Sequence, residues 1–365
     1  MTVTLIQTVQ VFGGELGVNY NGVFSQIDRA DLTRTKAHWI RGFVDYYQFK
    51  NGSRSLRSDA GLKKFALAHS QGYKTIINLK FNFENRDLPI GPAAIRRELS
   101  YLETVLDAVY DDTELLVCGN EPFIESKIAQ RDARLSNFYK AVALRVKAYR
   151  EGQVRKVPLY IGAFNNLWKP SWQTQAAADL LQFAQTSPWI AGIDLHIHHT
   201  LLSDIDEAFE FVNPRIRGDQ KILVTEFSLK NEWKLHLRDP IPSILVTEYN
   251  RPSGWQVYQY LNFTIHSPVS RAEWVDFLRN SSWFESRKDY LTTAWRKFAA
   301  NPKFQVATYG LYQNAPKIFT AKTDPWIINP LIVNQTVVRD PKTGRYQANY
   351  EFLKEFIALQ SGQKE

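Results

Sequence analysis

Two glutamates close short apolar stretches in opposite halves of the chain. Glu121 follows residues 114–120 (ELLVCGN), and Glu226 follows residues 221–225 (KILVT). Apolar runs of this length are typical of buried strands in a parallel sheet, and carboxylates at the carboxyl ends of such strands lie where sheets and barrels hold their reactive groups. A pair of carboxylates, one protonated and one ionised, is the minimum needed to hydrolyse a glycosidic bond.

The residues on either side of Glu121 fit this chemistry. Asn120 could hold a substrate hydroxyl, and Pro122 would end the strand and fix the direction of the glutamate side chain. The same tripeptide also fits a strand-end turn with an exposed, inactive glutamate, because short motifs often arise by chance. The second strand-end glutamate, Glu226, favours the catalytic interpretation.

Apolar stretches and helical patterns alternate along the chain. We expect strands at residues 16–20, 39–44, 74–80, 114–119, 158–164, 193–198, 221–227 and 303–309. Helical spacing predicts helices at residues 27–35, 62–71, 95–109, 135–149, 176–186, 205–212 and 350–359. This alternation predicts an α/β fold, and eight strands are the number that closes into a (β/α)8 TIM barrel. With 44% hydrophobic residues, the chain can form one such domain over residues 1–365.

Two connections are longer than the barrel needs. Residues 229–302 separate the seventh and eighth strands and contain a helix start at Ser270, with Glu273 three residues later. Residues 323–344 follow the eighth strand and are rich in Pro and Asn. Long connections are more often functional than idle, so we expect the first to form one wall of a cleft.

Aromatic residues follow several predicted strands. If the barrel is correct, Glu121 and Glu226 face one another across its mouth, and rings at strand ends could stack on the apolar faces of sugars. We expect this role for Tyr46, Trp168, Trp233 and Trp326. Core packing is an equally good explanation for any single one of these rings.

The pattern resembles the clan A glycoside hydrolases, which are retaining (β/α)8 enzymes. In that clan the fourth strand ends in Asn-Glu, often Asn-Glu-Pro, and the seventh ends in a glutamate that an aromatic residue commonly follows. Asn120-Glu121-Pro122 and Thr225-Glu226-Phe227 match both motifs in the expected strands and order. The resemblance spans nearly the whole barrel, but the motifs are too short to assign one family within the clan.

The resemblance implies a role for each matching residue. Glu121 would be the acid/base, Glu226 the nucleophile, and Asn120 a ligand of the sugar 2-hydroxyl. Arg41 on the second strand matches the arginine that supports the nucleophile, and we include it among the residues expected to bind substrate. A structural ion pair inside the barrel would explain it equally well.

Three further positions belong to the expected sugar-binding set. His196 matches a position where the clan often has His or Tyr. His198 and Tyr309 stand where many members have Tyr and Trp, respectively, so both depart from the pattern.

Two other functions remain open from the sequence. His196 and His198 alternate on one strand and could ligate Zn²⁺ in a metal-dependent hydrolase, but the other histidines do not lie at strand ends. A carbohydrate-binding barrel without turnover is the second alternative, and the two intact glutamates argue against it. The principal prediction requires neither a metal ion nor a cofactor.

The composition limits the partners. A net charge of +8 permits an acidic polysaccharide as substrate, whereas the scattered lysines and arginines do not form a nucleic-acid patch. No apolar run is long enough to span a membrane, and no signal peptide is visible, although the substrate class would suit a secreted or periplasmic protein. The single cysteine, Cys118, excludes an intrachain disulfide.

Overall fold

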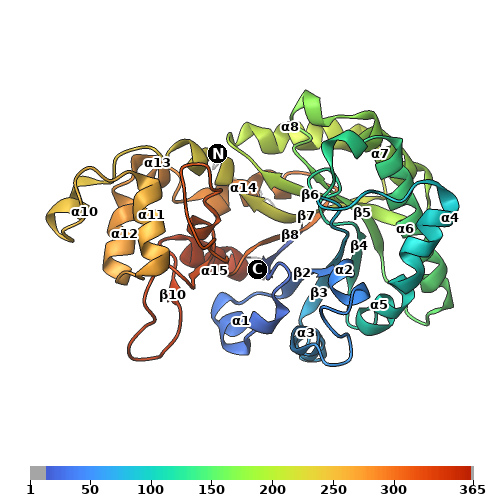
Figure 1. Cartoon of the computed structure of the whole chain (residues 1–365), viewed down its shortest axis with the longest axis horizontal. Coiled ribbons are helices and arrows are strands. Elements are labelled where there is room, and N and C mark those ends of the chain that lie inside the picture. The colour runs from blue at the N-terminus through green and yellow to red at the C-terminus, as the bar shows by residue number, and fades with distance from the viewer. Residues whose placement is uncertain (1–13, 363–365) are drawn as a thin grey trace, which may run out of the picture.

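The computed structural model describes residues 14–362 and contains a closed barrel of eight parallel strands (Figure 1). Each strand pairs with the next, and the last pairs with the first. The strands are β1 (Glu15–Asn19), β2 (Trp39–Asp45), β3 (Lys74–Lys80), β4 (Leu115–Cys118), β5 (Leu159–Asn165), β6 (Ile190–His198), β7 (Lys221–Ser228) and β8 (Phe304–Gly310). The predicted (β/α)8 fold is confirmed, and the observed strand bounds differ from the predicted ones by only a few residues.

Helices cover the outside of the barrel. They are α1 (Arg29–Thr35), α2 (Tyr46–Lys50), α3 (Ala60–Ser70), α4 (Gly91–Glu98), α5 (Leu102–Val109), α6 (Ala133–Gly152), α7 (Gln175–Thr186), α8 (Ser203–Val212) and α15 (Phe352–Gly362). The helix predicted at residues 95–109 consists of α4 and α5, joined by the 3-10 turn η2 (Leu99–Tyr101). The other 3-10 helices are η1 (Phe24–Gln26), η3 (Ile128–Gln130), η4 (Pro170–Trp172), η5 (Asn213–Arg215) and η6 (Trp326–Ile328).

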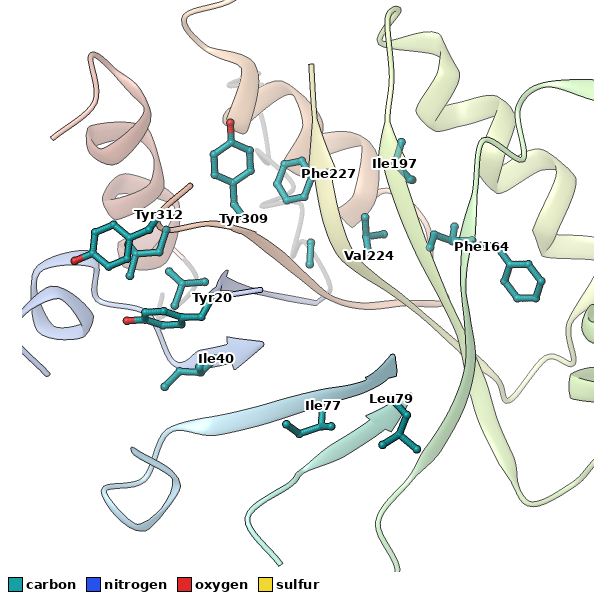
Figure 2. Close-up of a cluster of buried hydrophobic side chains, with 14 of the residues drawn as sticks. Tyr20, Ile40, Ile77, Leu79, Phe164, Ile197, Val224, Phe227, Tyr309 and Tyr312 are labelled. Carbon is teal, nitrogen blue, oxygen red and sulfur yellow. The ribbon is translucent and has the colours of Figure 1, made fainter. Parts of the chain in front are cut away.

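Successive strand residues face opposite sides of the sheet, and this alternation builds two apolar layers. One layer lies between the strands and the helices, and Figure 2 shows part of it, including Ile77, Leu79 and Val224. The other layer is a smaller cluster inside the barrel, composed of Trp39, Ile76, Leu115, Val117, Tyr160, Leu223 and Val306. On four strands a polar residue follows the inner position two residues later, so the barrel interior becomes more polar towards its carboxyl end. These residues are Arg41, Asn78, Thr225 and Thr308.

The connection between β7 and β8 is largely helical. It contains α9 (Lys230–Leu235), α10 (Ser243–Thr247), α11 (Val257–His266), α12 (Arg271–Arg279), α13 (Ser282–Glu285) and α14 (Tyr290–Ala299). Ser270 caps α12 by accepting from the Glu273 amide at 3.1 Å, as the sequence predicts. Helices α10, α11 and α12 lie on the side of the barrel away from α4, α5 and α6 (Figure 1).

After β8 the chain forms η6 and a two-stranded antiparallel sheet of β9 (Ile332–Val333) and β10 (Gln347–Ala348). A parallel bridge between Val269 and Val337 attaches this segment to the β7–β8 connection. None of the helices within residues 14–362 combines the length and the apolar character that crossing a bilayer requires.

Trp233 on α9 anchors the long connection to the closing helix. Its ring is fully buried and stacks at 5.9 Å on Phe284 of α13 and at 6.2 Å on Phe352 of α15. We predict that Trp233→Ala lowers the free energy of unfolding by about 3–5 kcal/mol, because it removes a large buried ring and leaves a cavity. Urea denaturation followed by circular dichroism measures this loss.

Leu235→Ala on the same helix is the matched control, because Leu235 is 68% exposed. Its effect should stay within about 0.5 kcal/mol. Equal losses in the two variants would contradict the anchoring role of Trp233.

Candidate active site

The structure brings Glu121 and Glu226 together at the carboxyl end of the barrel. One side-chain atom from each of Glu121, His196, His198 and Glu226 lies within 4.8 Å of those of the other three, so the two carboxylates approach to that distance or less. Each glutamate side chain is about one-sixth exposed, at 18% for Glu121 and 15% for Glu226. The predicted meeting of the two acids is therefore observed, and both remain open to a ligand.

A β-bulge in β7 directs Glu226 into the barrel. Leu195 of β6 pairs with Val224, but the next residue, His196, pairs with Glu226, so Thr225 is an additional residue in β7. Because a bulge re-aims the side chains around it, both Thr225 and Glu226 face inward. Strict alternation would place them on opposite faces.

Arg41 of β2 lies directly behind Glu226. Its side chain is fully buried and forms an ion pair with the Glu226 carboxylate. It also donates hydrogen bonds to the side-chain oxygens of Asn120 at 2.6 Å, Asn78 at 3.0 Å and Asn19 at 3.2 Å. The expected support of Glu226 is observed, but the expectation that Arg41 binds substrate is wrong, because no part of its side chain is accessible.

A polar network below Arg41 fixes this arrangement. Asn78 donates to Asp194 Oδ2 at 2.8 Å, and Asp194 also accepts from the Thr225 amide at 3.1 Å and hydroxyl at 2.6 Å. All three residues are fully buried. In the sequence, Asn78 and Asp194 are polar residues within otherwise apolar strands. This pattern could have identified them, but the sequence interpretation did not use it.

Glu121 is held from two sides. Asn165, the last residue of β5, donates to Glu121 Oε1 at 2.7 Å, and His196 Nδ1 lies 3.0 Å from the same oxygen. Burial alone would raise the pKa of Glu121, but the contact with His196 outweighs burial and lowers it. Asn165 was absent from the predicted site.

His196 stands between the two carboxylates. Its Nδ1 atom is 3.0 Å from Glu121 and 3.8 Å from Glu226, and its Nε2 atom is 3.0 Å from the Thr225 hydroxyl. Burial alone would lower the pKa of His196, but the negative charges of Glu226 and Glu121 raise it. These directions favour a protonated His196 between two ionised carboxylates, although the Arg41 guanidinium, 3.2 Å from His196 Nε2, opposes the charge on the imidazole.

Glu226 is the more strongly ionised acid. Burial would raise its pKa, but the charges of His196 and Arg41 hold that pKa well below its usual range. His198 Nε2 lies 3.4 Å from Glu226, and its Nδ1 atom lies 2.9 Å from the Ser228 hydroxyl. Burial lowers the pKa of His198, so this imidazole is neutral beside the carboxylate.

Asn120 also belongs to this network. Its side-chain oxygen accepts from Arg41, and its Nδ2 atom donates to Glu125 Oε1 at 2.6 Å. Glu125 in turn forms a 2.5 Å ion pair with Lys80, whose ammonium lies 4.8 Å from the centre of the Phe43 ring. The contact of Asn120 with a sugar hydroxyl stays a prediction, and Glu125 and Lys80 were missed by the sequence interpretation.

Four of the five predicted aromatic sugar contacts are wrong. Tyr46, Trp233 and Tyr309 are fully buried, and Trp168 is only 7% exposed. Tyr46 is the first residue of α2 and packs on Phe81. Residues just past a strand end thus belong in part to the next helix and its core, which leaves no ring face for a sugar.

Trp326 is the predicted aromatic residue that does reach the site. It lies on η6, is partly exposed, and meets the His198 ring at 4.7 Å with an interplanar angle of 84°. Tyr309, in contrast, donates its hydroxyl to Asn329 at 2.8 Å and packs on Phe227. Trp326 therefore provides the ring beside the carboxylates that the sequence assigned in part to Tyr309.

The four clustered groups also include ligand types that bind metal ions, because imidazoles and carboxylates are common zinc ligands. The sequence interpretation considered only histidines as partners for His196 and His198 and overlooked the two glutamates. However, the Arg41 guanidinium already neutralises Glu226 from inside the barrel. The charge of Glu226 is thus balanced by a cation of the protein's own.

Comparisons with known proteins establish the fold. No family model and no curated protein matches the sequence. Among solved structures, the chain is similar to virulence factor SghA from Agrobacterium tumefaciens, with 11% identity, a TM-score of 0.54, and coverage of 96% of this chain and 97% of that one. It is also similar to the GH1 β-glucosidase from Exiguobacterium antarcticum B7, with 9% identity, a TM-score of 0.51, and coverage of 98% and 99%.

A third similar structure is a glucosidase from Croceicoccus marinus, with 11% identity, a TM-score of 0.53, and coverage of 97% of this chain and 68% of that one. At these identities the likeness shows a shared (β/α)8 fold. The chemistry of this chain rests on the site itself.

The proton assigned to His196 gives a direct test of the charges in the site. We predict that His196 titrates above its ordinary pKa of 6.5, and that Glu226→Gln moves this pKa downwards, because burial then acts with less opposing charge. NMR titration of ¹⁵N-labelled histidine measures both values, and the His196→Gln variant identifies the resonance among the seven histidines.

Glu151→Gln is the matched control, since Glu151 pairs with Lys147 on the surface of α6. It should leave the His196 titration unchanged. A His196 pKa below 6.5 in the wild type, or one that Glu226→Gln does not move, would contradict the proposed charge distribution.

Proposed function

We propose that this protein is a retaining glycoside hydrolase in which Glu226 is the nucleophile and Glu121 the acid/base. The observation that carries the proposal is the approach of the two carboxylates to within 4.8 Å. Retaining enzymes hold their carboxyl groups about 5–5.5 Å apart, whereas inverting enzymes leave about 6.5–9.5 Å for a water molecule. The observed separation favours the retaining arrangement.

In the first step Glu226 attacks the anomeric carbon. The bond from that carbon to the leaving oxygen breaks and an ester forms with Glu226. The leaving oxygen takes a proton from Glu121, which receives it from His196. Arg41, His196 and the neutral His198 ring keep Glu226 ionised and fix its direction. In the second step a water oxygen bonds to the anomeric carbon, the ester bond to Glu226 breaks, and a proton of that water passes to Glu121.

The proton for the first step is stored on His196. It lies 3.0 Å from Glu121 Oε1, so transfer between the two groups needs no rearrangement of the backbone. Attack by Glu226 removes the negative charge that holds the proton on His196, and loss of that charge favours transfer. Glu121 therefore acts as an acid although its pKa in the resting site is lowered.

The substrate we propose is an oligo- or polysaccharide. Trp326 offers a partly exposed ring next to His198, which in turn lies 3.4 Å from Glu226, and such rings bind the apolar faces of sugars. The net charge of +8 favours an acidic polysaccharide. The glucosidases among the similar structures support the general class of reaction.

Glutamine variants test both roles. We predict that Glu121→Gln lowers kcat/KM by about 10²–10⁴-fold, as expected for loss of a general acid. Glu226→Gln should cause a loss at least as large, because the first step then lacks its nucleophile. A library of oligosaccharides identifies the substrate, and NMR of the first product formed should show the anomer of the bond that was cleaved.

Glu210→Gln on the exposed face of α8 is the control and should retain full activity. Near-full activity in either site variant would refute the role of that glutamate, and an inverted product would refute the mechanism. Binding of glycans with no product would instead favour the non-catalytic barrel. Activity lost on dialysis against EDTA and restored by Zn²⁺ would favour the metal-dependent hydrolase.

A further inference from the structure

Two lysines share one carboxylate next to Trp326. Asp324 accepts from Lys230 Nζ at 2.9 Å and from Lys234 Nζ at 2.5 Å. Lys230 Nζ also lies 4.9 Å from the centre of the Trp326 ring. Both lysines belong to α9, which begins directly after the strand that carries Glu226.

This cluster carries an excess of positive charge. Burial would raise the pKa of Asp324, but the two lysines lower it, so the carboxylate is ionised and balances only one of them. The acidic residue of α9, Glu232, pairs instead with Arg287 at 3.3 Å. One lysine charge therefore has no counterpart within the cluster.

Lys80, which belongs to the network around Asn120, has a carboxylate partner of its own. Lys80 pairs one-to-one with Glu125 at 2.5 Å, and its side chain is only 19% exposed. Lys230 is 15% exposed and Lys234 is 42% exposed, so Lys234 is the lysine that can meet a ligand from solution. The unbalanced lysine charge thus lies in the cluster next to Trp326.

The position of the two lysines relative to Glu226 follows from three successive contacts. His198 lies 3.4 Å from Glu226, Trp326 meets His198 at 4.7 Å, and the Lys230 ammonium lies next to the Trp326 ring. A sugar stacked on Trp326 would therefore lie beside Glu226. The substituents of that sugar, or those of its neighbour in the chain, would come within reach of the two lysines.

We infer that Lys230 and Lys234 form a subsite for an anionic sugar, which carries a carboxylate or a sulfate ester. This inference rests on the proposed function and assigns the substrate class of the same site. Anions bind most strongly where an ammonium is partly shielded from water and can donate a charge-assisted hydrogen bond. The net charge of +8 also attracts a polyanionic chain towards the protein.

A purely structural role would need only one of the lysines. The ion pair between Lys230 and Asp324 is sufficient to tether the η6 segment, and with it Trp326, to α9. Lys234 adds a second, more exposed ammonium to the same carboxylate. An anion-binding role accounts for both residues.

The test compares acidic oligosaccharides with neutral counterparts of the same backbone. Oligogalacturonates and oligomannuronates are paired with their carboxyl-reduced forms, and sulfated galactan oligosaccharides with their desulfated forms. Calorimetric titration in the Glu121→Gln background avoids turnover. We expect the acidic member of at least one pair to bind about tenfold more tightly, as one charge-assisted hydrogen bond permits.

In Lys234→Met the ratio of the two affinities should fall towards one, and added salt should have the same effect. A tethering role would weaken both members together and leave the ratio unchanged. Lys288→Met is the control, because Lys288 forms a comparable exposed ion pair with Glu285 far along the connection. It should preserve the ratio.

The inference is overturned if no acidic oligosaccharide is preferred, or if neither Lys234→Met nor Lys230→Met changes the ratio. Preference for carboxylated over sulfated ligands, or the reverse, identifies which anion the subsite accepts. Hydrolysis of a neutral oligosaccharide with no acidic preference would refute this subsite and leave the proposed function intact. Failure to bind or hydrolyse any oligosaccharide would refute both.

Discussion

The buried ion pair between Arg41 and Glu226 is the constraint on which the rest of the site depends. A guanidinium removed from water is costly unless its charge and its N–H groups are satisfied. Here the carboxylate balances the charge, and three side-chain oxygens accept from the remaining N–H groups. These acceptors are Asn19, Asn78 and Asn120. A single side chain thereby connects β1, β2, β3, β7 and the end of β4, and it positions both the proposed nucleophile and the residue before the proposed acid.

The layers of the barrel explain why such a polar site is tolerated. The inner apolar cluster closes the barrel beneath Arg41, and the layer between strands and helices supplies most of the hydrophobic burial. The polar network therefore lies between a dry interior and the open mouth. Asn78, Asp194 and Thr225 at its base are buried and hydrogen-bonded to one another, and such contacts make this part of the network rigid.

Much of the fold followed from the sequence, because strands covered on both faces read as apolar runs and a barrel repeats them at regular intervals. The meeting of Glu121 and Glu226 followed as well, since residues at strand ends share one rim. The direction of side chains beyond a strand end could not be predicted from the sequence. Tyr46 and Trp233, which were expected at the mouth, lie in the core. The bulge that turns Glu226 inward, and the contacts of Asn165, depend on pairing between strands that a single sequence does not display.

The central claim is that Glu226 forms a covalent bond with the sugar, and covalent trapping tests it most directly. The measurement uses a 2-deoxy-2-fluoro glycoside with a good leaving group, built on the sugar that the wild type cleaves, followed by mass spectrometry of the digested protein. Fluorine destabilises both transition states, and the good leaving group lets the ester form faster than it is hydrolysed. The account predicts one glycosyl group per chain, attached to Glu226. A label on another residue, or none from a compound that the wild type turns over with inversion, would contradict it.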